Sequence, residues 1–553
     1  MRVLGVNAIF HDPAAALVVD GQVVAAAEEE RFSRRKHGKR PVPFSAWELP
    51  ELSMRWCLET AGLRPQDLDA VAYSFDPALA KPVDSDPWDH LRLDYARRAP
   101  SFLATALPGL DPAQVQFVPH HVAHAASAGL AAPHPRNSVL VLDGRGESTS
   151  HLAGTYRDGA LQVLAAQQLP HSLGLLYESL TEHLGFLRSS DEFKVMALAS
   201  HGTPRHLEEL RELVHATGNG GFVAPELDWH RWAPPRRGGE ESWAARHADL
   251  AASVQQRLEE VLVDLATWVH AQTGDQVLTM AGGTALNCVA NSRIWRESPF
   301  EQVWVQPAAG DAGTALGAAL QTSADGGQVP APMPSAALGR GWSDADLAAW
   351  LRRAQVPFTT PDDLAGEVAD VLVADGVVAW FDGRSEYGPR ALGQRSLLAN
   401  PMHAANLERL NDVKGREQFR PVAPMVLTER AAEIFGNGPV PSPYMLFVHD
   451  VSPLWRDRVP AVVHVDGTAR IQTVDSSTNA GIAALLRAFA ARTGVPVLVN
   501  TSLNTAGRPM VDDPRDALEV FGSAPVDVLV LGPHLVRRAA TFRSHSGGGR
   551  ADE

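Results

Sequence analysis

Cysteine and long apolar runs are scarce in this sequence. Its 553 residues include two cysteines, Cys57 and Cys288, which cannot form a disulfide framework and fit a reducing compartment. No apolar run approaches the roughly 20 residues of a membrane span. His11 and Asp12 interrupt the short apolar start, which argues against a secretory signal peptide. We therefore expect a cytoplasmic protein without a membrane partner.

Basic residues are also in the minority. The chain has 49 Lys and Arg against 64 Asp and Glu, a formal net charge of −15. A general nucleic-acid-binding protein needs a broad basic surface, so no nucleic-acid partner is expected, although a local anion pocket is compatible with this balance. A hydrophobic content of 45% and a charged content of 20% are typical of a globular chain and exclude a fibrous or largely disordered one.

A strand–loop–hairpin pattern occurs twice in the first half of the chain. Its first copy comprises Arg2–Phe10, Ala14–Val19 and Gln22–Glu28, with a hairpin turn at Asp20-Gly21. Its second copy comprises Ser138–Leu142, His151–Tyr156 and Leu161–Ala166, with a turn at Asp158-Gly159. We interpret the repetition as a duplicated, actin-like or ribonuclease-H-like α/β fold with a cleft between its halves.

Two strand–glycine–helix junctions follow a long predicted helix, Ala248–Thr273. The first runs from the strand Gln276–Ala281 through two glycines to a helix over Thr284–Trp295. The second runs from the strand Val303–Gln306 to a helix over Asp311–Gln321. The two junctions repeat the same local arrangement within the first domain.

Proline and glycine mark the domain boundary. The stretch Thr322–Leu338 is the best linker candidate, and it separates a domain over residues 1–330 from a second α/β domain over 340–540. The tail, residues 541–553, is expected to be disordered. Residues 80–115 and 218–246 lack clean periodicity, and we interpret them as insertions that could contact an acceptor.

Four potential metal ligands occur at separate points of the first domain. His120 and His124 are four residues apart, so on a helix both imidazoles project from one side. Asp143 ends an apolar strand, and Asp311 lies at the second strand–helix junction. Each feature alone is common, as a histidine pair in a core or an aspartate that caps a turn. Their combination predicts a divalent-metal site beside a nucleotide cleft.

Glycines at the two junctions suit a bound nucleotide. Gly282, Gly283 and Gly313 would let the backbone approach a ligand closely, and the helix that starts near Asn287 offers free N–H groups to an anion. The simpler alternative for such glycines is a tight turn.

The second domain contains a local basic region, Asp382–Arg430. It holds eight Lys and Arg and six Asp and Glu, a net charge of +2 in a chain of net charge −15. Guanidinium groups bind phosphate oxygens in pairs, and lysine adds a point charge. The region is therefore a candidate anion site, with surface salt bridges as the alternative. Arg470 and Ser502 follow apolar strands and add a guanidinium and a hydroxyl group.

These residues resemble the motifs of the NodU/CmcH family of O-carbamoyltransferases, whose members carbamoylate antibiotics such as tobramycin. The resemblance spans residues 1–540. The segments that carry it are His11-Asp12, Glu28–Arg34, His120–Ala125, Leu142–Glu147, Lys194–Ala199, the basic region and Asn500–Asn504. It implies an actin-like N-terminal domain and a YrdC-like α/β C-terminal domain.

The resemblance also implies a two-step reaction. The C-terminal domain would convert carbamoyl phosphate and ATP, with Mg²⁺, into carbamoyl adenylate and release phosphate and pyrophosphate. The N-terminal domain would then transfer the carbamoyl group to a hydroxyl group of a small-molecule acceptor. That acceptor is the partner we expect, and a homodimer is left open.

Residue roles follow from the same resemblance. The metal ligands, for iron in this family with Mn or Zn left open, are His120, His124, Asp143 and Asp311. The adenylate cleft contains Gly282, Gly283, Asn287 and Gly313. The carbamoyl-phosphate site contains Arg390, Lys414, Arg420, Arg470 and Ser502, of which Lys414 and Arg420 are also expected to act in catalysis. His11 corresponds to a histidine near the acceptor and is our candidate base.

Three alternatives remain at this point. A tRNA threonylcarbamoyl-type modification enzyme would use the same adenylate chemistry, but the acidic balance speaks against tRNA contact. An actin-like small-molecule kinase would leave the basic region unexplained. A non-catalytic actin-like filament or scaffold predicts that neither His120 nor Arg390 matters for turnover.

Overall fold

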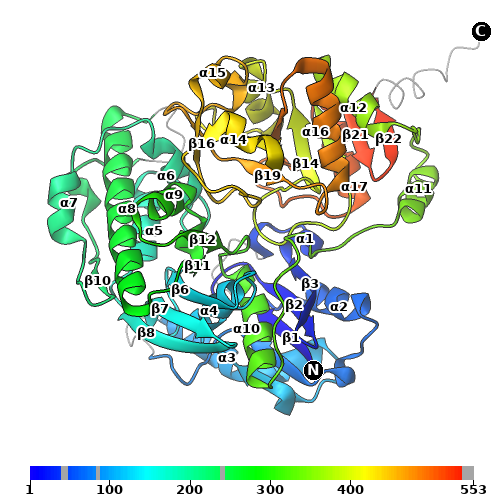
Figure 1. The fold of residues 1–553 in the computed structure, drawn as a ribbon. Helices are drawn as coiled ribbons and strands as arrows, with labels where there is room; N and C mark the ends of the chain where they lie inside the picture. Colours follow the sequence, from blue (N-terminus) through cyan, green and yellow to red (C-terminus); the bar gives the residue numbers. More distant parts are fainter. Residues whose placement is uncertain (39–47, 82–86, 237–242, 539–553) are drawn as a thin grey trace, which may run out of the picture. The chain divides into compact units, whose positions relative to one another are not determined.

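The computed structural model describes residues 1–38, 48–81, 87–236 and 243–538 (Figure 1). The chain divides into two compact units, Met1–Pro334 and Ser335–Glu553. This division falls inside the predicted linker Thr322–Leu338. The tail for which we expect disorder, 541–553, lies outside the described residues.

The first unit begins with a five-stranded sheet in the order β3-β2-β1-β4-β5. Its strands are β1 (Arg2–Asn7), β2 (Ala14–Val19), β3 (Gln22–Glu28), β4 (Ala70–Tyr73) and β5 (Val115–Phe117). The first three strands pair antiparallel, and β4 and β5 add in parallel to β1.

A second five-stranded sheet repeats this arrangement in the order β8-β7-β6-β11-β12. Its strands are β6 (Arg136–Leu142), β7 (Thr149–Arg157), β8 (Ala160–Gln168), β11 (Val277–Ala281) and β12 (Gln302–Val305). Strands β6, β7 and β8 pair antiparallel, and β11 and β12 add in parallel to β6. The identical order and directions confirm the predicted actin-like duplication.

Both hairpin turns have the backbone conformation that their sequences predict. Asp20 and Gly21 have φ angles of 49° and 78°, and Asp158 and Gly159 have φ angles of 51° and 80°. A two-residue hairpin of this kind requires positive φ at both positions, which aspartate and glycine tolerate best.

A tight helix pair joins the two halves of the first unit. Helix α10 (Ala312–Asp325) packs on β1, β2 and β4, whereas α4 (His120–Gly129) packs on β6, β7 and β11, and the two helices lie against each other (Figure 1). A Cβ atom at Gly317 would lie 1.7 Å from the carbonyl oxygen of Ala123. Only glycine therefore permits this approach, which places the start of α10 near the start of α4.

Residues 80–115, which we interpret as an insertion, contribute side chains to the core of the first half. This region contains helix α3 (Pro87–Ala106), and its side chains Leu93, Ala99 and Leu103 are buried in the core of the first half. The helix buries its apolar face, but Pro100 and scattered polar residues hide the helical periodicity of that face in the sequence. Residues 82–86 lie outside the described part of the chain.

The other region, 218–246, contains little regular structure among its described residues. It includes strand β10 (Phe222–Val223), a short 3-10 turn at Trp229–Arg231 and the first residues of helix α8 (Ala245–Thr273). Residues 237–242 lie outside the described residues.

Two predicted boundaries also need correction. The helix expected over Thr284–Trp295 starts later, because Gly283–Leu286 forms a 3-10 turn and helix α9 spans Cys288–Glu297. The predicted linker starts too early, because α10 continues to Asp325. The extended part after α10 is tied to the hairpin by a hydrogen bond from the backbone N–H of Ala331 to the carbonyl oxygen of Gly21.

The second unit is built on a seven-stranded mixed sheet in the order β19-β15-β20-β14-β13-β21-β22. The strands are β13 (Val378–Phe381), β14 (Arg395–Ala399), β15 (Ala423–Leu427), β19 (Gln472–Val474), β20 (Val497–Ser502), β21 (Val528–Leu531) and β22 (His534–Arg537). Its main helices include α12 (Leu364–Val373), α13 (Ala405–Lys414), α16 (Ala480–Thr493) and α17 (Pro514–Ser523).

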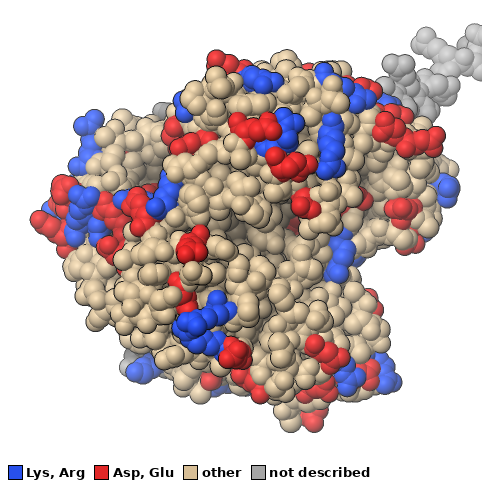
Figure 2. Space-filling view, in the orientation of Figure 1, with Lys and Arg blue, Asp and Glu red and all other residues tan. Residues whose placement is uncertain are grey.

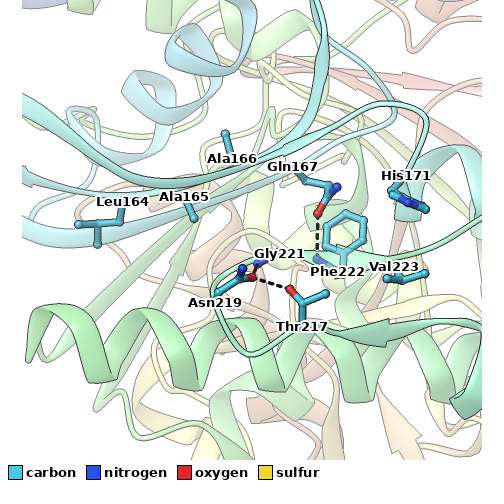
Figure 3. A pocket seen from close by; sticks show the side chains of 10 residues that line it. All are labelled: Leu164, Ala165, Ala166, Gln167, His171, Thr217, Asn219, Gly221, Phe222 and Val223. Carbon is cyan, nitrogen blue, oxygen red and sulfur yellow. Dashed lines mark hydrogen bonds between the residues drawn. The ribbon is translucent and has the colours of Figure 1, made fainter.

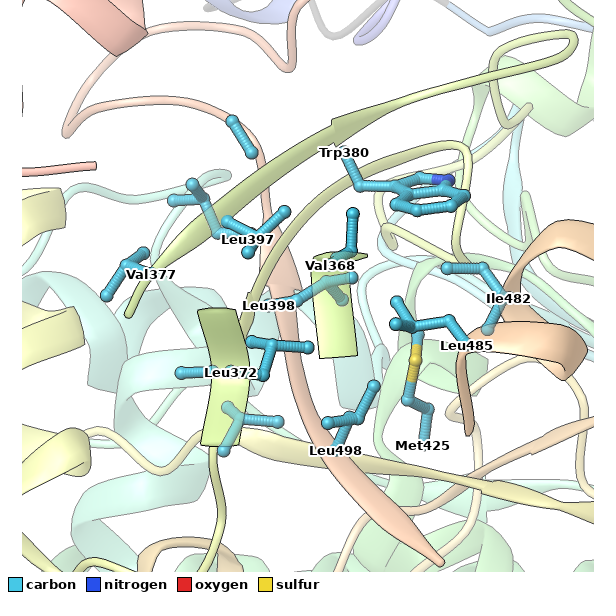
Figure 4. Packing of buried hydrophobic residues seen from close by; sticks show 14 of the residues in the cluster. Val368, Leu372, Val377, Trp380, Leu397, Leu398, Met425, Ile482, Leu485 and Leu498 are labelled. Atoms are coloured by element: carbon cyan, nitrogen blue, oxygen red, sulfur yellow. The ribbon is translucent and has the colours of Figure 1, made fainter. Parts of the chain in front are cut away.

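Helices α12 and α16 pack together over this sheet and close its core (Figure 4). Val368 and Leu372 of α12 and Ile482 and Leu485 of α16 are fully buried with Trp380 of β13. The helix pair thus shields one face of a strand set that is apolar on both sides. The unit is a mixed α/β domain, in agreement with the predicted YrdC-like class.

No helix in the described part of the chain combines the length and the apolar character that a bilayer crossing requires.

Candidate functional site

Four predicted ligands come together where the two halves of the first unit meet. His120 and His124 lie on the first turns of α4, Asp143 follows β6, and Asp311 precedes α10. The Nε2 atoms of His120 and His124 lie 3.5 and 3.9 Å from Oδ2 of Asp143, and 3.7 and 3.6 Å from Oδ1 of Asp311. The tight α4–α10 pair is what brings residues so distant in sequence together.

These distances suit a shared metal ion better than direct hydrogen bonds. Ligands at about 2.1 Å from one ion in a tetrahedral arrangement are separated by about 3.4 Å, close to the observed spacings. The Nε2 atoms of His120 and His124 are buried and make no hydrogen bond to any described residue. Imidazole and carboxylate donors match Fe, Mn and Zn. The residues therefore fit the divalent metal that the family resemblance implies.

The electrostatics of the cluster also favour a positive charge there. Burial lowers the pKa of His120, but Asp143 and Asp311 outweigh it and hold that pKa well above its usual value. Burial raises the pKa of Asp143, but His120 and His121 outweigh it and hold that pKa well below its usual range. Two ionised carboxylates in one buried site require a compensating cation.

Hydrogen bonds around the cluster orient its ligands. Nδ1 of His120 lies 3.1 Å from the carbonyl oxygen of Ser74, which fixes Nδ1–H as the donor and turns the Nε2 atom toward the carboxylates. The backbone N–H of Gly283 donates to Oδ1 of Asp143 at 3.1 Å. The carboxylate of Glu147 accepts from the backbone N–H of His120 at 2.7 Å and so stabilises the start of α4.

Sequence reasoning missed a third histidine at this site. His121 is buried, its Nδ1 contacts Oγ1 of Thr149 at 2.7 Å, and its Nε2 lies 3.6 Å from Oδ2 of Asp143. That Nε2 atom makes no hydrogen bond to the described residues. The sequence signal for it was the second histidine of the pair His120-His121. A residue next to a predicted ligand on a helix can still face the end of a neighbouring strand.

His11 lies next to the cluster. Its backbone N–H donates to Oδ2 of Asp311 at 3.1 Å, and its ring Nδ1 lies 2.9 Å from Oδ2 of Asp12. The other oxygen of Asp12 contacts Nδ1 of His37 at 2.9 Å. Burial raises the pKa of Asp12, but His11 and His37 outweigh it and hold that pKa well below its usual range. Neither Asp12 nor His37 was among the predicted site residues.

The glycines predicted to bind a nucleotide make close backbone contacts within this unit. A Cβ atom at Gly282 would lie 2.2 Å from the carbonyl oxygen of Leu142, and one at Gly313 would lie 2.0 Å from that of Ala308. Gly283 uses its N–H on Asp143, as described above. The side chain of Asn287 caps α9 by accepting from the backbone N–H of Ala290 at 3.1 Å. Gly282, with a φ of 93°, thus fits the tight-turn alternative, whereas Gly313 lies within helix α10 and Gly283 contacts Asp143.

The basic region of the second unit splits into structural and clustered arginines. Arg395 is fully buried, lies 3.7 Å over the ring of Phe381, and donates to backbone carbonyls that include that of Asp382 at 2.9 Å. Arg384 likewise donates to the carbonyl oxygen of Gly339 at 2.9 Å. Arg430 pairs with Glu433 on the surface. Arg395 and Arg384 therefore support loops and Arg430 forms a surface ion pair, and these contacts explain the three arginines better than anion binding does.

Three other arginines crowd together. Burial, and after it the charges of Arg420 and Arg470, lower the pKa of Arg416 to about 9. The Nε atom of Arg470 is buried without a hydrogen bond to any described residue. Mutual repulsion among guanidinium groups is relieved by a bound anion. Arg416 was not among the predicted site residues, although it follows Lys414 in the same motif.

Arg390 lies on a loop that is hydrogen-bonded to Gln472 of β19. Oε1 of Glu386 accepts from three backbone N–H groups of this loop, those of Leu392, Gln394 and Arg395, at 2.7–3.1 Å. Gln472 donates to the carbonyl oxygen of Leu392 at 2.7 Å, only two residues from Arg470. The buried carboxylate and amide therefore hold the Arg390 loop against β19.

Lys414 is engaged by the loop after β20. Its buried Nζ lies 2.6 and 3.0 Å from the carbonyl oxygen and Oγ of Ser502, and 3.1 and 2.6 Å from the carbonyl oxygen and Oδ1 of Asn504. The structure thus brings Lys414 and Ser502 together. Its contacts indicate that Lys414 shapes this loop, because four oxygen atoms already surround the ammonium group.

An open pocket of about 480 Å³ lies along β8, the edge strand of the second sheet (Figure 3). Gln167 of β8 points toward Phe222, whose backbone N–H donates to Oε1 of Gln167 at 2.9 Å. Thr217 and Asn219 line the opposite side. The described residues that line this pocket include none of the predicted site residues, so it is separate from the histidine–aspartate cluster.

Charged side chains of both signs are interspersed over the described residues on the face drawn in Figure 2.

Comparison with known proteins identifies the class as carbamoyltransferases. The chain matches the family models Carbamoyltransferase N-terminus, at residues 2–84 and 102–320, and Carbamoyltransferase C-terminus, at residues 369–538. The chain belongs to the carbamoyltransferase family, and the predicted NodU/CmcH resemblance is confirmed.

Its relatives include two nodulation proteins. The chain is 38% identical to nodulation protein NolNO of Sinorhizobium fredii, over 96% of this chain and 80% of that protein. It is 30% identical to nodulation protein U of Rhizobium tropici, over 94% of this chain and 93% of that protein. Among solved structures, an activator of 2-hydroxyisocaproyl-CoA dehydratase from Clostridium difficile shares 13% identity, with a TM-score of 0.31 over 59% of this chain and 95% of that one.

Proposed function

We propose that this carbamoyltransferase is ATP-dependent, forms carbamoyl adenylate from carbamoyl phosphate and ATP, and carbamoylates a hydroxyl group of a small-molecule natural product, as in antibiotic tailoring. The observation that carries the proposal is the contact between His11 and Asp311. Through this contact the candidate base, His11, lies directly beside Asp311, one of the four buried candidate metal ligands.

The adenylate is made in the second unit. Arg416, Arg420 and Arg470 bind the phosphate oxygens of carbamoyl phosphate or ATP, because their crowded guanidinium groups gain most from a dianion. Water cleaves carbamoyl phosphate to carbamate and phosphate, and a carbamate oxygen then attacks the α-phosphate of MgATP. The bond to pyrophosphate breaks, which leaves a carbamoyl adenylate whose leaving group is AMP.

Lys414 and the loop that it holds border this chemistry. By fixing Ser502 and Asn504 through its ammonium group, Lys414 sets the shape of the loop at the end of β20. Arg390 lies on a neighbouring loop that is tied to β20 through a hydrogen bond from Asn500 to the carbonyl oxygen of Ala391, at 2.9 Å. Preorganised donors of this kind lower the cost of binding a charged substrate.

A divalent metal, iron by family resemblance with Mn or Zn as alternatives, would be held by His120, His124, Asp143 and Asp311 and would supply Lewis-acid polarisation. The surrounding residues keep the site ready for it. Ser74 fixes the tautomer of His120, and Gly283 fixes the orientation of Asp143.

Transfer takes place in the first unit. His11 removes the proton of the acceptor hydroxyl as its oxygen forms a bond to the carbamoyl carbon. The bond from that carbon to the adenylate oxygen breaks, and AMP leaves with the electron pair. Asp12 stabilises the imidazolium that forms on His11, because its carboxylate lies 2.9 Å from Nδ1.

The test is to incubate the full-length protein with carbamoyl phosphate, MgATP, a divalent metal and a panel of hydroxyl-bearing natural products. We expect AMP and pyrophosphate in equal amounts and a product heavier by one carbamoyl group. Release of ADP with a phosphorylated acceptor would instead establish a kinase, and modification of tRNA would establish a threonylcarbamoyl-type enzyme.

A further inference from the structure

Asp12 lies between two imidazoles and contacts each with a different oxygen. Oδ2 lies 2.9 Å from Nδ1 of His11, and Oδ1 lies 2.9 Å from Nδ1 of His37. An ionised carboxylate only accepts hydrogen bonds, so these two short contacts favour a proton on Nδ1 of each ring. In a neutral His11, the Nε2 atom is then the one with a lone pair.

His37 is itself held at three points. Its Nε2 atom lies 2.7 Å from Oγ of Ser190, its backbone N–H donates to Oε2 of Glu30 at 2.8 Å, and its Nδ1 contacts Asp12. Ser190 belongs to the second half of the first unit, whereas His37 and Asp12 belong to the first half. The orientation of Asp12 therefore depends on contacts from both halves.

The backbone around this group adopts an uncommon conformation. Asp12 and His37 have φ angles of 45° and 59°, and Phe10 has a φ of 57°, although none of them is glycine. The side chain of the buried Asn7 donates to the carbonyl oxygens of His11 and Asp12, at 2.8 and 3.0 Å, and holds the loop in this shape. Left-handed backbone at non-glycine residues is costly and often marks a functional site.

We propose that Asp12 and His37 are positioning residues that fix His11 in the Nδ1–H tautomer, so that its Nε2 can accept the proton of the acceptor hydroxyl. The inference rests on the proposed role of His11 in carbamoyl transfer. Asp12 orients the base and balances its charge, and His37, anchored by Ser190 and Glu30, prevents the carboxylate from turning away. The arrangement follows the logic of a carboxylate–histidine pair, with the second imidazole as its support.

The tautomer is tested directly in full-length protein labelled with ¹⁵N at histidine. The signals of His11 are identified by their loss in His11→Asn. In the unchanged protein we expect a protonated Nδ1 and an unprotonated Nε2, and in Asp12→Asn a shift toward the Nε2–H tautomer, because the amide can donate to Nδ1. His37→Gln should give a mixture. An unchanged tautomer in both variants, or an Nε2–H tautomer in the unchanged protein, overturns the proposal.

A second experiment separates positioning from folding and from the proposed function. Carbamoylation is measured with glycerol, which needs a base, and with hydroxylamine, a stronger nucleophile that needs much less help. Asp12→Asn should slow the glycerol reaction about 10²-fold or more and leave the hydroxylamine reaction within a few-fold. Equal loss with both nucleophiles overturns the proposal. If the unchanged protein carbamoylates neither one, the proposed function fails, while the tautomer result still decides the inference.

His230→Gln is the matched control, because His230 is exposed and belongs to neither site. A competing interpretation is that His11, Asp12 and His37 hold a second metal ion, since their ligand atoms all lie within 4.8 Å of one another. Titration with Co²⁺ distinguishes the two. One bound ion per chain in both the unchanged protein and Asp12→Asn supports the hydrogen-bonded arrangement, whereas a fall from two ions to one overturns it.

Discussion

The backbone N–H of His11 donates to Oδ2 of Asp311, 3.1 Å away and 300 residues later in the chain. The contact links the loop between β1 and β2 to the residue before α10. The same carboxylate turns its other oxygen toward His120 and His124. One aspartate thereby connects the candidate base with the candidate metal ligands.

His120→Ala should abolish tight metal binding at the cluster. The substitution removes one of two imidazoles and leaves two buried carboxylates facing each other, so affinity should fall by at least about 100-fold. The measurement is metal content per chain after dialysis, combined with thermal melting. A chelator should lower the melting temperature of the unchanged protein and have no effect on His120→Ala. His230→Ala should behave like the unchanged protein, and retention of a full equivalent of metal by His120→Ala would contradict the assignment.

Arg470→Ala should remove the anion site of the second unit. An anion that binds the folded state alone raises stability by RT ln(1 + [L]/Kd), about 2.7 kcal/mol at 100 times Kd. Inorganic phosphate should therefore raise the melting temperature of the unchanged protein, and this rise should disappear in Arg470→Ala. Arg487→Ala is the control, because Arg487 is half-exposed and pairs with Glu429. An equal phosphate effect in all three proteins would place the anion site elsewhere.

Lys414→Met should prevent formation of the adenylate. The thioether cannot replace an ammonium that contacts four oxygen atoms of Ser502 and Asn504, so the loop after β20 loses its shape. We expect carbamoyl-phosphate-dependent exchange between ATP and pyrophosphate to fall at least about 100-fold, with metal content unchanged. Arg409→Met, on the exposed side of the same helix, should retain exchange. Exchange at the normal rate in Lys414→Met would show that the loop is dispensable.

Glu192→Gln should weaken the pH dependence of stability. Burial, and after it the charge of Glu178, raise the pKa of Glu192 from 4.5 to about 7. The folded protein therefore keeps a proton that the unfolded chain loses between these two values, and stability falls as the pH rises through that window. The cost is at most about 3 kcal/mol. Melting at pH 5 and pH 8 should show a smaller decrease for Glu192→Gln than for the unchanged protein, and parallel decreases would refute the shift.

His11→Ala should spare adenylate formation and slow the transfer. The second unit contains the residues proposed for the first step, whereas His11 lies in the first unit. Exchange between ATP and pyrophosphate should stay within a few-fold of normal, while carbamoylation of an alcohol should fall about 10²–10⁴-fold. Equal losses in the two half-reactions would remove the role of base from His11.

Local patterns predicted much of the fold. The hairpin turns at Asp20-Gly21 and Asp158-Gly159 could be predicted, because both turn positions require a positive φ, which aspartate and glycine tolerate. Apolar-rich runs on either side of the first turn predicted β2 and β3 with the observed bounds. Helix α3 escaped prediction, because Pro100 and scattered polar residues hid the period of the face that it buries.

The candidate metal ligands were likewise visible as residue types, but not every neighbour was. His121, Asp12 and His37 acquire meaning only through contacts that are made across the fold, such as the 2.9 Å contact between His37 and Asp12. The basic region shows the converse. Its charge count suggested one anion site, yet Arg384 and Arg395 bind backbone carbonyls while Arg416 is crowded by Arg420 and Arg470.

The sequence by itself determined the duplicated strand–loop–hairpin pattern, the family and the donor types at the cluster, because turn chemistry, apolar runs and motif spacing are local properties. Only the tertiary structure decided which polar groups share a site. The close approach of α4 and α10, which Gly317 permits, brings Asp311 to His120 and His124. Packing between segments hundreds of residues apart sets such distances, and a one-dimensional pattern contains no record of them.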